Sequence, residues 1–405
     1  MKMLARTVSA TLLALLLFDL WMLSLNIFTV RAVGTIFIRS DGTIDPATAS
    51  ISSIDGITYT FTNSVSDEIV VEKSNIIVDG AGFPLQGTRT LNSTGLLLAG
   101  VSNVLIRGMN IIGFFSAIKL EWSSDIEIIG NSLTNNDFGV WLHESTRITI
   151  SANNIQGGWA GINLAWSRNS GVQDNKITDN EHGILLHWSL NNDVSENSLE
   201  DNEVGISLAW SANNNLEGNN MTNAAKRGSY GIRLHSSARN TIIANLMANS
   251  LHGVKLIYES TENSLVANNV TNNFYGIYVS YASNNTIHHN SFVGNTNQAK
   301  SYKSVNTWDD GYPSGGNYWS DYRGVDEKSG LGQDQLGSDE IGDTPYIIDE
   351  NNRDRYPIIG EIHQPTFIVD MHLLYVILAM AVVGSIGSAF FLIRRRKKTK
   401  VSRGS

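Results

Sequence analysis

The sequence predicts an all-β protein whose short strands coil into a stack of parallel turns, and three observations support this fold class. A glycine followed by mostly apolar residues recurs every 22 residues, with a few intervals of 23 or 26. Each repeat also carries an asparagine at one fixed position, and two positions beside it are apolar. Such internal repetition is interpreted before any single motif, because it sets the whole fold. The repeated glycines are Gly95, Gly139, Gly161, Gly183, Gly205, Gly231, Gly253 and Gly276, with Ala117 in the second place.

The asparagine column shows how one repeat is built. The residues three before and two after each asparagine are apolar in every repeat. Together with the alternating residues of the glycine tetrad, they mark three short β segments, separated by Asn, Ser, Asp and Gly in turns. The column consists of Asn131, Asn153, Asn175, Asn197, Asn219, Asn245, Asn268 and Asn290.

Three strands per repeat close into one turn of a coil, and stacked turns pair each strand with its copy above and below. The apolar columns then form one continuous core, and no turn is stable alone. A stacked asparagine at a tight turn can bond to the backbone or to the next asparagine. We therefore assign the column a structural role.

The two ends predict a location for the chain. Lys2 and Arg6 precede an apolar stretch, so residues 1–32 are expected to be a secretory signal peptide, with an uncleaved anchor as the alternative. Residues 373–393 carry no charge and are long enough to span a bilayer. The basic tail 394–405 should then stay cytoplasmic. We expect a single-pass protein of the cell membrane whose N-terminal ectodomain is extracellular.

Four segments lie between these ends. Residues 33–68 are expected to form an N-terminal β cap that covers the open edge of the first turn. Residues 69–296 hold the repeats, 297–360 break the pattern and are expected to form a C-terminal cap module, and 361–372 are a linker.

The register Asn-x-Ile-x-x-Asn-x-x-Gly-Ile-x-Leu resembles that of the NosD-like and carbohydrate-binding/sugar-hydrolysis families over about residues 69–295. The resemblance implies a right-handed parallel β-helix of about ten 22-residue rungs. It also points to relatives that are exported accessory proteins of nitrous oxide reductase maturation, often labelled copper-binding. Its functional content is small, because the recurring residues are those that build the coil.

Composition excludes several function classes. The chain has 405 residues and a net charge of -9, so nucleic acid is not expected as a partner. It has no cysteine, which excludes disulfides, thiolate metal sites and a thiol nucleophile.

A second column, five residues after the tetrad glycine, is aromatic and is interrupted by Glu144 and Ser236. If its rings point outward, they form a flat apolar stripe on which sugar rings can stack. If they lie over the turn, they pack on one another and shield the corner. Both interpretations stay open. The carbohydrate-binding candidates are Trp122, Trp166, Trp188, Trp210, Tyr258 and Tyr281.

An acidic patch on two adjacent repeats is the catalytic candidate. Like charges one turn apart would raise a pKa or recruit a cation, and a carboxyl pair about 5 to 10 Å apart suits glycosidase chemistry. Solvated turns are the alternative explanation, and the motif set of polygalacturonases is absent. The candidate residues are Asp179, Glu181, His182, Asp201 and Glu203.

Metal sites receive little support from the sequence. Asp334, Asp339 and Asp343 lie in a glycine-rich loop that suits calcium or a solvated turn. His143, His187 and His235 skip turns and should lie about 10 Å apart, too far to share an ion. His288 and His289 would point to opposite faces of a strand, and the lack of cysteine disfavours Cu(I). No cofactor is required; calcium is the one to consider, and copper is not expected.

Four N-glycosylation sequons occur, at Asn92, Asn220, Asn269 and Asn284. The sequence as a whole predicts a membrane-anchored surface protein with a binding or structural role, most plausibly toward carbohydrate. The alternatives are a polysaccharide lyase, hydrolase or epimerase acting at the acidic patch, and a NosD-type maturation factor.

Overall fold

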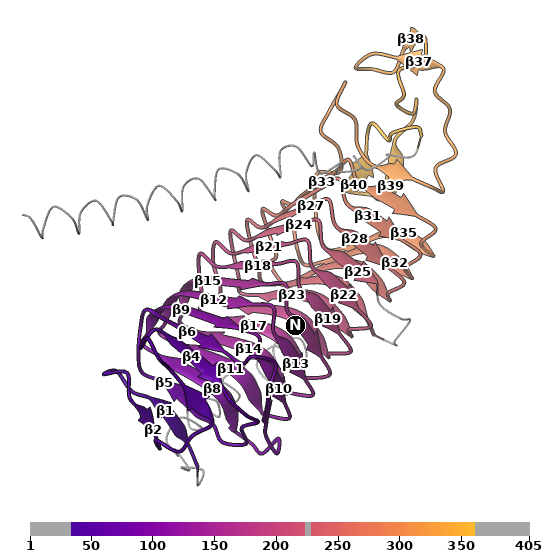
Figure 1. The fold of residues 1–405 in the computed structure, drawn as a ribbon. Helices are drawn as coiled ribbons and strands as arrows, with labels where there is room; N and C mark the ends of the chain where they lie inside the picture. The colour runs from indigo at the N-terminus through magenta and orange to yellow at the C-terminus, as the bar shows by residue number, and fades with distance from the viewer. Residues whose placement is uncertain (1–33, 223–227, 361–405) are drawn as a thin grey trace, which may run out of the picture. The chain divides into compact units, whose positions relative to one another are not determined.

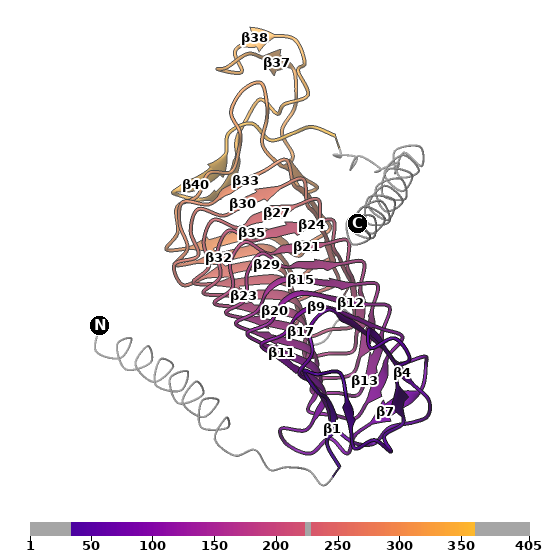
Figure 2. The ribbon, with the colours of Figure 1, turned by 60° about the vertical axis from the view of Figure 1, so that its left-hand side comes forward.

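The computed structural model describes residues 34–222 and 228–360, and the regular elements in these ranges are all β-strands. They build a parallel β-solenoid of about eleven turns, one more than the sequence predicts (Figure 1). The predicted all-β class and the parallel stacking are confirmed. Figure 2 shows the strands of successive turns lying side by side in continuous sheets.

Three long sheets form the faces of the solenoid. Sheet A has the order β2 (Ile44–Asp45), β1 (Ile36–Ile38), β5 (Ile69–Val71), β8 (Thr94–Ala99), β11 (Ser116–Glu121), β14 (Phe138–His143), β17 (Ala160–Ala165), β20 (His182–His187), β23 (Val204–Ala209), β26 (Tyr230–His235), β29 (His252–Ile257), β32 (Tyr275–Ser280) and β35 (Asn297–Tyr302).

Sheet B follows sheet A in each turn. Its order is β3 (Ile51–Ser52), β4 (Thr58–Phe61), β6 (Ile76–Asp79), β9 (Ser102–Arg107), β12 (Ser124–Ile129), β15 (Thr146–Ser151), β18 (Gly171–Gln173), β21 (Asp193–Ser195), β24 (Asn215–Glu217), β27 (Thr241–Ile243), β30 (Ser264–Val266) and β33 (Thr286–His288).

Sheet C completes the turn. Its order is β36 (Tyr318–Trp319), β34 (Ser291–Val293), β31 (Asn269–Thr271), β28 (Leu246–Ala248), β25 (Asn220–Thr222), β22 (Ser198–Glu200), β19 (Lys176–Thr178), β16 (Asn154–Gln156), β13 (Ser132–Thr134), β10 (Asn110–Ile112) and β7 (Pro84–Gln86).

The tetrad glycines are required by close packing between turns. In sheet A, Ile162 pairs with Ile184 of the next turn, and both side chains are buried in the core. A Cβ atom on Gly161 would lie 2.6 Å from Cγ2 of Ile177 and 2.7 Å from the Gly183 carbonyl oxygen. Only a residue without a side chain fits there, which explains the glycine column.

The asparagine column forms the expected ladder. Asn175 Nδ2 donates to Asn197 Oδ1 at 2.9 Å and also to the Ile150 carbonyl oxygen at 2.9 Å. Asn197 repeats the pattern with Asn219. The ladder continues through Asn290 to Asn317. These bonds satisfy buried polar groups that would otherwise destabilise the core.

A second asparagine ladder was not predicted, although its column stands five residues before the first. Asn192 Nδ2 donates to Asn214 Oδ1, and the same contact repeats up to Asn285 and Asn306. A serine column follows the aromatic column, where the Ser167 backbone nitrogen donates to Ser189 Oγ. The described part of the solenoid is therefore tied along its axis at several corners.

The segment expected to be an N-terminal cap contributes strands to two sheets. β1 pairs antiparallel with β2 and parallel with β5. β3 pairs antiparallel with β4, which in turn runs parallel to β6.

Residues 297–360 begin with a last solenoid strand, β35, and continue in loops with two small hairpins. The hairpins are β37 (Lys328–Ser329) with β38 (Gln335–Leu336), and β39 (Tyr346–Asp349) with β40 (Asn352–Asp354). Trp319 lies between Phe292 and Tyr346, with ring centroids 4.5 Å and 4.3 Å away and nearly parallel planes. This stack joins the last turn of the solenoid to the segment that follows it.

The expected signal peptide, linker, membrane span and basic tail fall in residues 1–33 and 361–405, outside the described residues. Within the ranges that are described, no helix combines the length and apolar character needed to cross a bilayer.

Candidate functional site

The aromatic column lies at the turn that follows each strand of sheet A. All six of its aromatic residues have a left-handed backbone, with φ between 47° and 53°. Bulky residues rarely adopt this conformation. It turns the side chains toward solvent: Trp122 is 60% exposed, Trp166 45% and Trp188 43%. Tyr258 and Tyr281 are exposed as well, while Trp210 is partly buried.

The rings of this column also contact each other and the last side chains of sheet A. The Trp188 and Trp210 rings are nearly parallel, at 8°, with centroids 5.2 Å apart. Because stacked rings touch at about 3.5 Å, they must be offset by about 4 Å, which leaves part of each face uncovered. His187 and His235 fill the places beside them, each with its ring about 5 Å from a neighbouring aromatic ring. Both interpretations of the column therefore hold in part, and we call it the aromatic edge.

Beside the aromatic edge, the outer face of sheet A carries cations among tyrosines. Parallel register places Arg233 next to Lys255, and Tyr278 next to Lys300. Lys255 Nζ lies 4.9 Å from the centroid of the Tyr230 ring, and Lys300 Nζ lies 5.5 Å from that of Tyr275. Among the described residues, no carboxylate pairs with Arg233, Lys255 or Lys300.

We call these three cations, with Tyr230, Tyr275 and Tyr278, the cationic face. This face was not predicted from the sequence, because its side chains come from four different turns. Its signal is the variable third residue of the glycine tetrad, which becomes basic or aromatic in the last turns.

Two histidines on the same sheet face, the half-buried His182 and the buried His252, are neutral at pH 7. Burial and, second to it, the Arg233 charge lower the pKa of His182 to about 4. Burial and Lys255 do the same for His252, whose pKa is also about 4. The His252 ring lies between Tyr230 and Tyr275, at centroid distances of 5.2 Å and 5.1 Å.

Several buried polar atoms of this face have no hydrogen-bond partner within the described chain. They include the Nδ1 atoms of His182 and His252, Trp141 Nε1 and Asn163 Oδ1. Unsatisfied buried groups are rare in proteins and indicate a role for a ligand or bound water. Most of the unsatisfied side-chain atoms of the described residues belong to strands of sheet A; the others are Asn269 Oδ1 in sheet C and Gln333 Oε1 in the C-terminal loops.

The acidic patch lies at the turns that lead from sheet C to sheet A. Asp179 is exposed in a left-handed turn, and its Oδ2 accepts a hydrogen bond from Gln156 Nε2. Glu181 and Glu203 are exposed at the turns before sheet A, and Asp201 lies at a left-handed turn. His182 packs edge-on against Trp159, with ring centroids 5.2 Å apart. A catalytic role of the acidic patch remains a prediction.

Two of the calcium candidates accept hydrogen bonds from backbone nitrogens of their own loop. Asp343 Oδ1 accepts hydrogen bonds from the backbone nitrogens of Glu327 and Lys328, and Asp339 Oδ2 accepts one from Gly330. In the described ranges these carboxylates and that of Asp334 do not gather into a group of metal-ligating side chains. Calcium binding stays a prediction. Of the sequon asparagines, Asn92, Asn220 and Asn284 are exposed and Asn269 is partly buried.

The expectation that His288 and His289 point to opposite faces holds for two residues in one strand, and here only His288 lies in a strand. β33 ends at His288, and His289 has a left-handed backbone with φ of 55°. This turn brings the two rings together, so that their Nδ1 atoms lie 2.9 Å apart. Asp310 lies beside them: one ligand atom from each of the three residues falls within 4.8 Å of the other two. His143, His187 and His235 form no such group.

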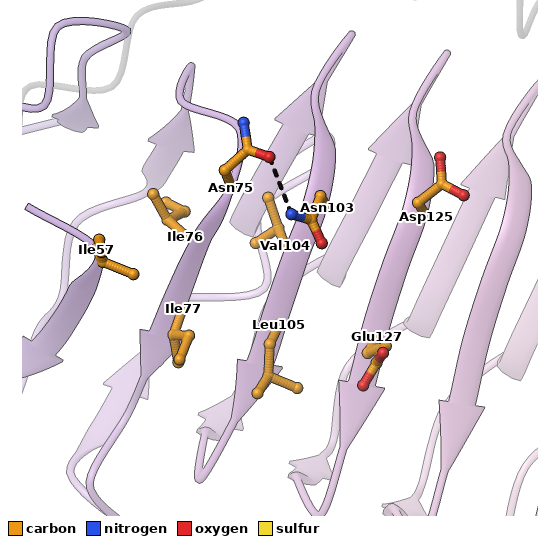
Figure 3. Close-up of a pocket in the computed structure, with 9 residues that line it drawn as sticks. All are labelled: Ile57, Asn75, Ile76, Ile77, Asn103, Val104, Leu105, Asp125 and Glu127. Carbon is orange, nitrogen blue, oxygen red and sulfur yellow. Dashed lines mark hydrogen bonds between the residues drawn. The ribbon is translucent and has the colours of Figure 1, made fainter. Parts of the chain in front are cut away.

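A depression of about 310 Å³ lies elsewhere, on the outer face of sheet B near the N-terminal turns (Figure 3). Ile57, Ile77 and Leu105 line it together with Asp125 and Glu127. At its rim Asn103 Nδ2 donates to Asn75 Oδ1 at 2.9 Å. It contains no histidine or basic side chain and lies apart from the cationic face.

Comparison with solved structures finds other solenoids. The A-module of a mannuronan C-5 epimerase from Azotobacter vinelandii matches 62% of this chain and 84% of its own length, with 13% identity and a TM-score of 0.49. A family 28 exopolygalacturonase from Yersinia enterocolitica matches 64% and 65%, with 11% identity and a TM-score of 0.47. At these values the matches carry no argument about activity. No curated protein matches.

One family model matches the chain, over residues 61–256 and again over 167–324. Its description is "Periplasmic copper-binding protein (NosD)". The two matches together cover more than half of the 405 residues. The chain therefore belongs to the NosD family of β-helix proteins.

Proposed function

We propose that this protein binds an acidic polysaccharide along sheet A, with sugar rings packed on the aromatic edge and carboxylates held by the cationic face. The observation that carries the proposal is the exposure of the aromatic edge. A soluble surface rarely leaves a line of large aromatic rings uncovered, and such apolar stripes indicate a binding surface. A sugar ring has an apolar face that can pack on an aromatic ring.

The cationic face gives the protein its preference for acidic polymers. The chain carries a net charge of -9, so a polyanion is repelled by most of its surface. Arg233, Lys255 and Lys300 oppose that repulsion at one place, and their only described attractive partners are tyrosine rings. A carboxylate or sulfate group on a ligand would form charge-assisted hydrogen bonds with them. Neutral polymers gain nothing from these three charges.

We further propose that binding takes place outside the cell, with the chain anchored by residues 373–393. The motivation is the charge pattern of the two ends. We propose binding without catalysis, and a polysaccharide-active enzyme acting at the acidic patch is the alternative.

The test is a binding assay of the full chain on immobilised polygalacturonate and alginate, with dextran as the neutral polymer. We expect retention on the acidic polymers that falls steeply with salt. The triple variant Trp166→Ala, Trp188→Ala, Trp210→Ala should lose binding to every polymer. The triple variant Arg233→Gln, Lys255→Gln, Lys300→Gln should lose the preference for acidic ones.

Two surface changes away from sheet A serve as controls. Lys176→Gln removes an exposed cation from sheet C, and Leu331→Ala removes an exposed apolar side chain near the C-terminal hairpins. Both should bind like the wild type. Failure of the folded wild type to bind any polymer, or unchanged binding by the tryptophan variant, would refute the proposal. Product formation during the assay would favour the enzymatic alternative.

A second candidate function follows from the family description, which names copper. Cu(II) prefers imidazole nitrogen in a square-planar or tetragonal arrangement. Among the described residues, His288, His289 and Asp310 are the group that offers such ligands.

A further inference from the structure

We propose that His288, His289 and Asp310 bind one divalent transition-metal ion that prefers square-planar or octahedral coordination. The site lies where sheet B ends and the loop 309–315 packs against the last turn. It shares no residue with the aromatic edge or the cationic face, so it stands independently of polysaccharide binding.

The two Nδ1 atoms are placed as a pair of metal ligands. They lie 2.9 Å apart. Ring nitrogens bind such metals at about 2.0–2.1 Å, so an ion that contacts both would subtend an angle of about 90° between them. A tetrahedral ion would need the two nitrogens about 3.3 Å apart. The geometry therefore favours Cu(II) or Ni(II) over Zn(II).

A hydrogen bond on the far side of His289 prepares its Nδ1 as a ligand. His289 Nε2 lies 2.8 Å from the Ser314 carbonyl oxygen. Because a carbonyl oxygen only accepts, Nε2 must carry the proton, and Nδ1 of the neutral ring keeps its lone pair. Metal-binding histidines are typically oriented by such a bond from the other ring nitrogen to a backbone carbonyl.

The two rings explain how the site exists without a metal. His289 Nδ1 accepts a hydrogen bond, so His288 Nδ1 must be the donor in the metal-free pair. When a metal binds, the proton leaves His288 Nδ1 and Nε2 of the same ring takes one up. The ring stays neutral, and both rings rotate so that the two Nδ1 lone pairs face the ion.

Asp310 completes the group with a negative charge. Its Oδ2 accepts a hydrogen bond of 2.7 Å from Ser314 Oγ, which holds the carboxylate beside the rings. Ligand atoms around one ion lie at most about 4.2 Å apart, so Asp310 needs to shift by less than about 1 Å. Its side chain is exposed and free of packing that would resist this movement. Water would fill the remaining positions.

Metal binding at this place would join the last turn to the loop after it. The His289 backbone nitrogen already donates a hydrogen bond of 2.6 Å to the Gly316 carbonyl oxygen. Ligands from β33 and from the loop 309–315 would hold these two segments to one ion.

The experiment is a titration of the full chain, purified without a histidine tag, with CuCl₂ and in parallel with NiCl₂ and ZnCl₂. Calorimetry against a competing chelator gives stoichiometry and affinity. Electron paramagnetic resonance gives the Cu(II) geometry and the number of bound nitrogens. We expect one equivalent of Cu(II), a tetragonal spectrum with coupling to two nitrogens, and tighter binding of Ni(II) than of Zn(II).

Variants separate ligands from folding effects. His289→Asn removes the ligand but keeps a residue that tolerates the left-handed backbone, and it should weaken Cu(II) binding at least about 100-fold, beyond the 10–100-fold typical of outer-shell losses. His288→Gln should do the same, and Asp310→Asn should cost about 10-fold. His143→Ala removes a histidine that lies beside the aromatic edge, and this variant should bind Cu(II) like the wild type.

Circular dichroism and the melting transition confirm that each variant is folded. Binding of one equivalent that is lost in both histidine variants supports the site. Wild-type protein that binds no equivalent, or a His288→Gln, His289→Asn double variant that binds with unchanged affinity and spectrum, overturns it.

Discussion

The Trp319 indole nitrogen donates a hydrogen bond of 2.9 Å to Oδ2 of the buried Asp354. The same oxygen accepts a bond of 2.7 Å from the Asn317 backbone, and Oδ1 accepts one from the Tyr356 backbone. Trp319 stacks on Phe292 of β34, the neighbouring strand in sheet C. One carboxyl group therefore ties the C-terminal segment to the end of the solenoid.

Replacing this carboxyl group should weaken the end of the solenoid. In Asp354→Asn, an amide N–H₂ faces backbone or indole N–H donors, and at least one buried donor loses its acceptor. We expect a loss of about 1–3 kcal/mol in the free energy of unfolding. Urea denaturation monitored by tryptophan fluorescence measures it. A variant as stable as the wild type would show that the contact is dispensable.

The same residue predicts a pH dependence. Burial raises the pKa of Asp354 to about 7, from an ordinary value of 3.8. The folded state then holds a proton that the unfolded state loses, so this group's contribution to stability is present below about pH 4 and is lost as the pH rises to about 7. Melting temperatures between pH 4 and 7 should show a smaller decline with rising pH in Asp354→Asn than in the wild type. Parallel curves would contradict the assignment.

His252 predicts a pH dependence of opposite sign. Its folded pKa of about 4 lies below the ordinary value of 6.5, because burial disfavours the charged ring. The unfolded state therefore gains a proton first, and the stability contributed by neutral His252 is lost as the pH falls from 6.5 toward 4. His252→Gln should remove this part of the acid sensitivity in the same melting series. If the variant loses as much stability at low pH as the wild type does, groups other than His252 cause the acid sensitivity.

The asparagine ladder predicts a large effect from one buried side chain. Asn175→Ala leaves the backbone nitrogen of Asn153 without its acceptor, while Asn153 Nδ2 keeps its bonds to the Ile128 and Ser151 carbonyl oxygens. One unsatisfied buried donor costs about 1–3 kcal/mol. The neighbour Asn154 is exposed, and Asn154→Ala should change the free energy of unfolding by less than about 0.5 kcal/mol. Equal effects in chemical denaturation would argue against the ladder.

Gly161 of the glycine column and Gly171 of the next strand allow a matched comparison of two Gly→Ala substitutions. A Cβ atom on Gly161 meets Ile177 and the Gly183 backbone, whereas one on Gly171 meets nothing within 4 Å. Gly161→Ala should destabilise by about 1–3 kcal/mol through overpacking. Gly171→Ala should be neutral or should stabilise by up to about 1 kcal/mol, because it restricts the unfolded chain. Thermal denaturation of the two variants decides, and the reverse order would refute the packing argument.

Much of the fold could be predicted from the sequence, because every turn of a solenoid repeats the same pattern of strands and corners. The interval from Gly139 to Gly161 sets the length of a turn, and identical columns must stack when turns of equal length are placed in parallel. Asn175 and Asn197 then meet for the same reason. The second ladder through Asn192 repeats with the same period, so it could have been predicted in the same way. The number of turns came out one too low.

The candidate sites depend on backbone φ angles and on the pairing of strands between turns. The repeated sequence columns do not show either of them. The left-handed backbone of Trp188 turns its ring toward solvent, while the same residue in an extended conformation would have a different direction. His289 shows the same effect, since its left-handed backbone brings its ring onto that of His288 and reverses the expectation for a strand. Arg233, Lys255 and Lys300 lie in three different turns, and only the sheet brings them together.

The sequence by itself thus determined the repeating coil, its inward columns and its first ladder, because these follow from period and polarity. The tertiary structure decided which polar groups face outward together. That choice depends on a few φ angles at the corners and on contacts between residues that are 22 or more positions apart.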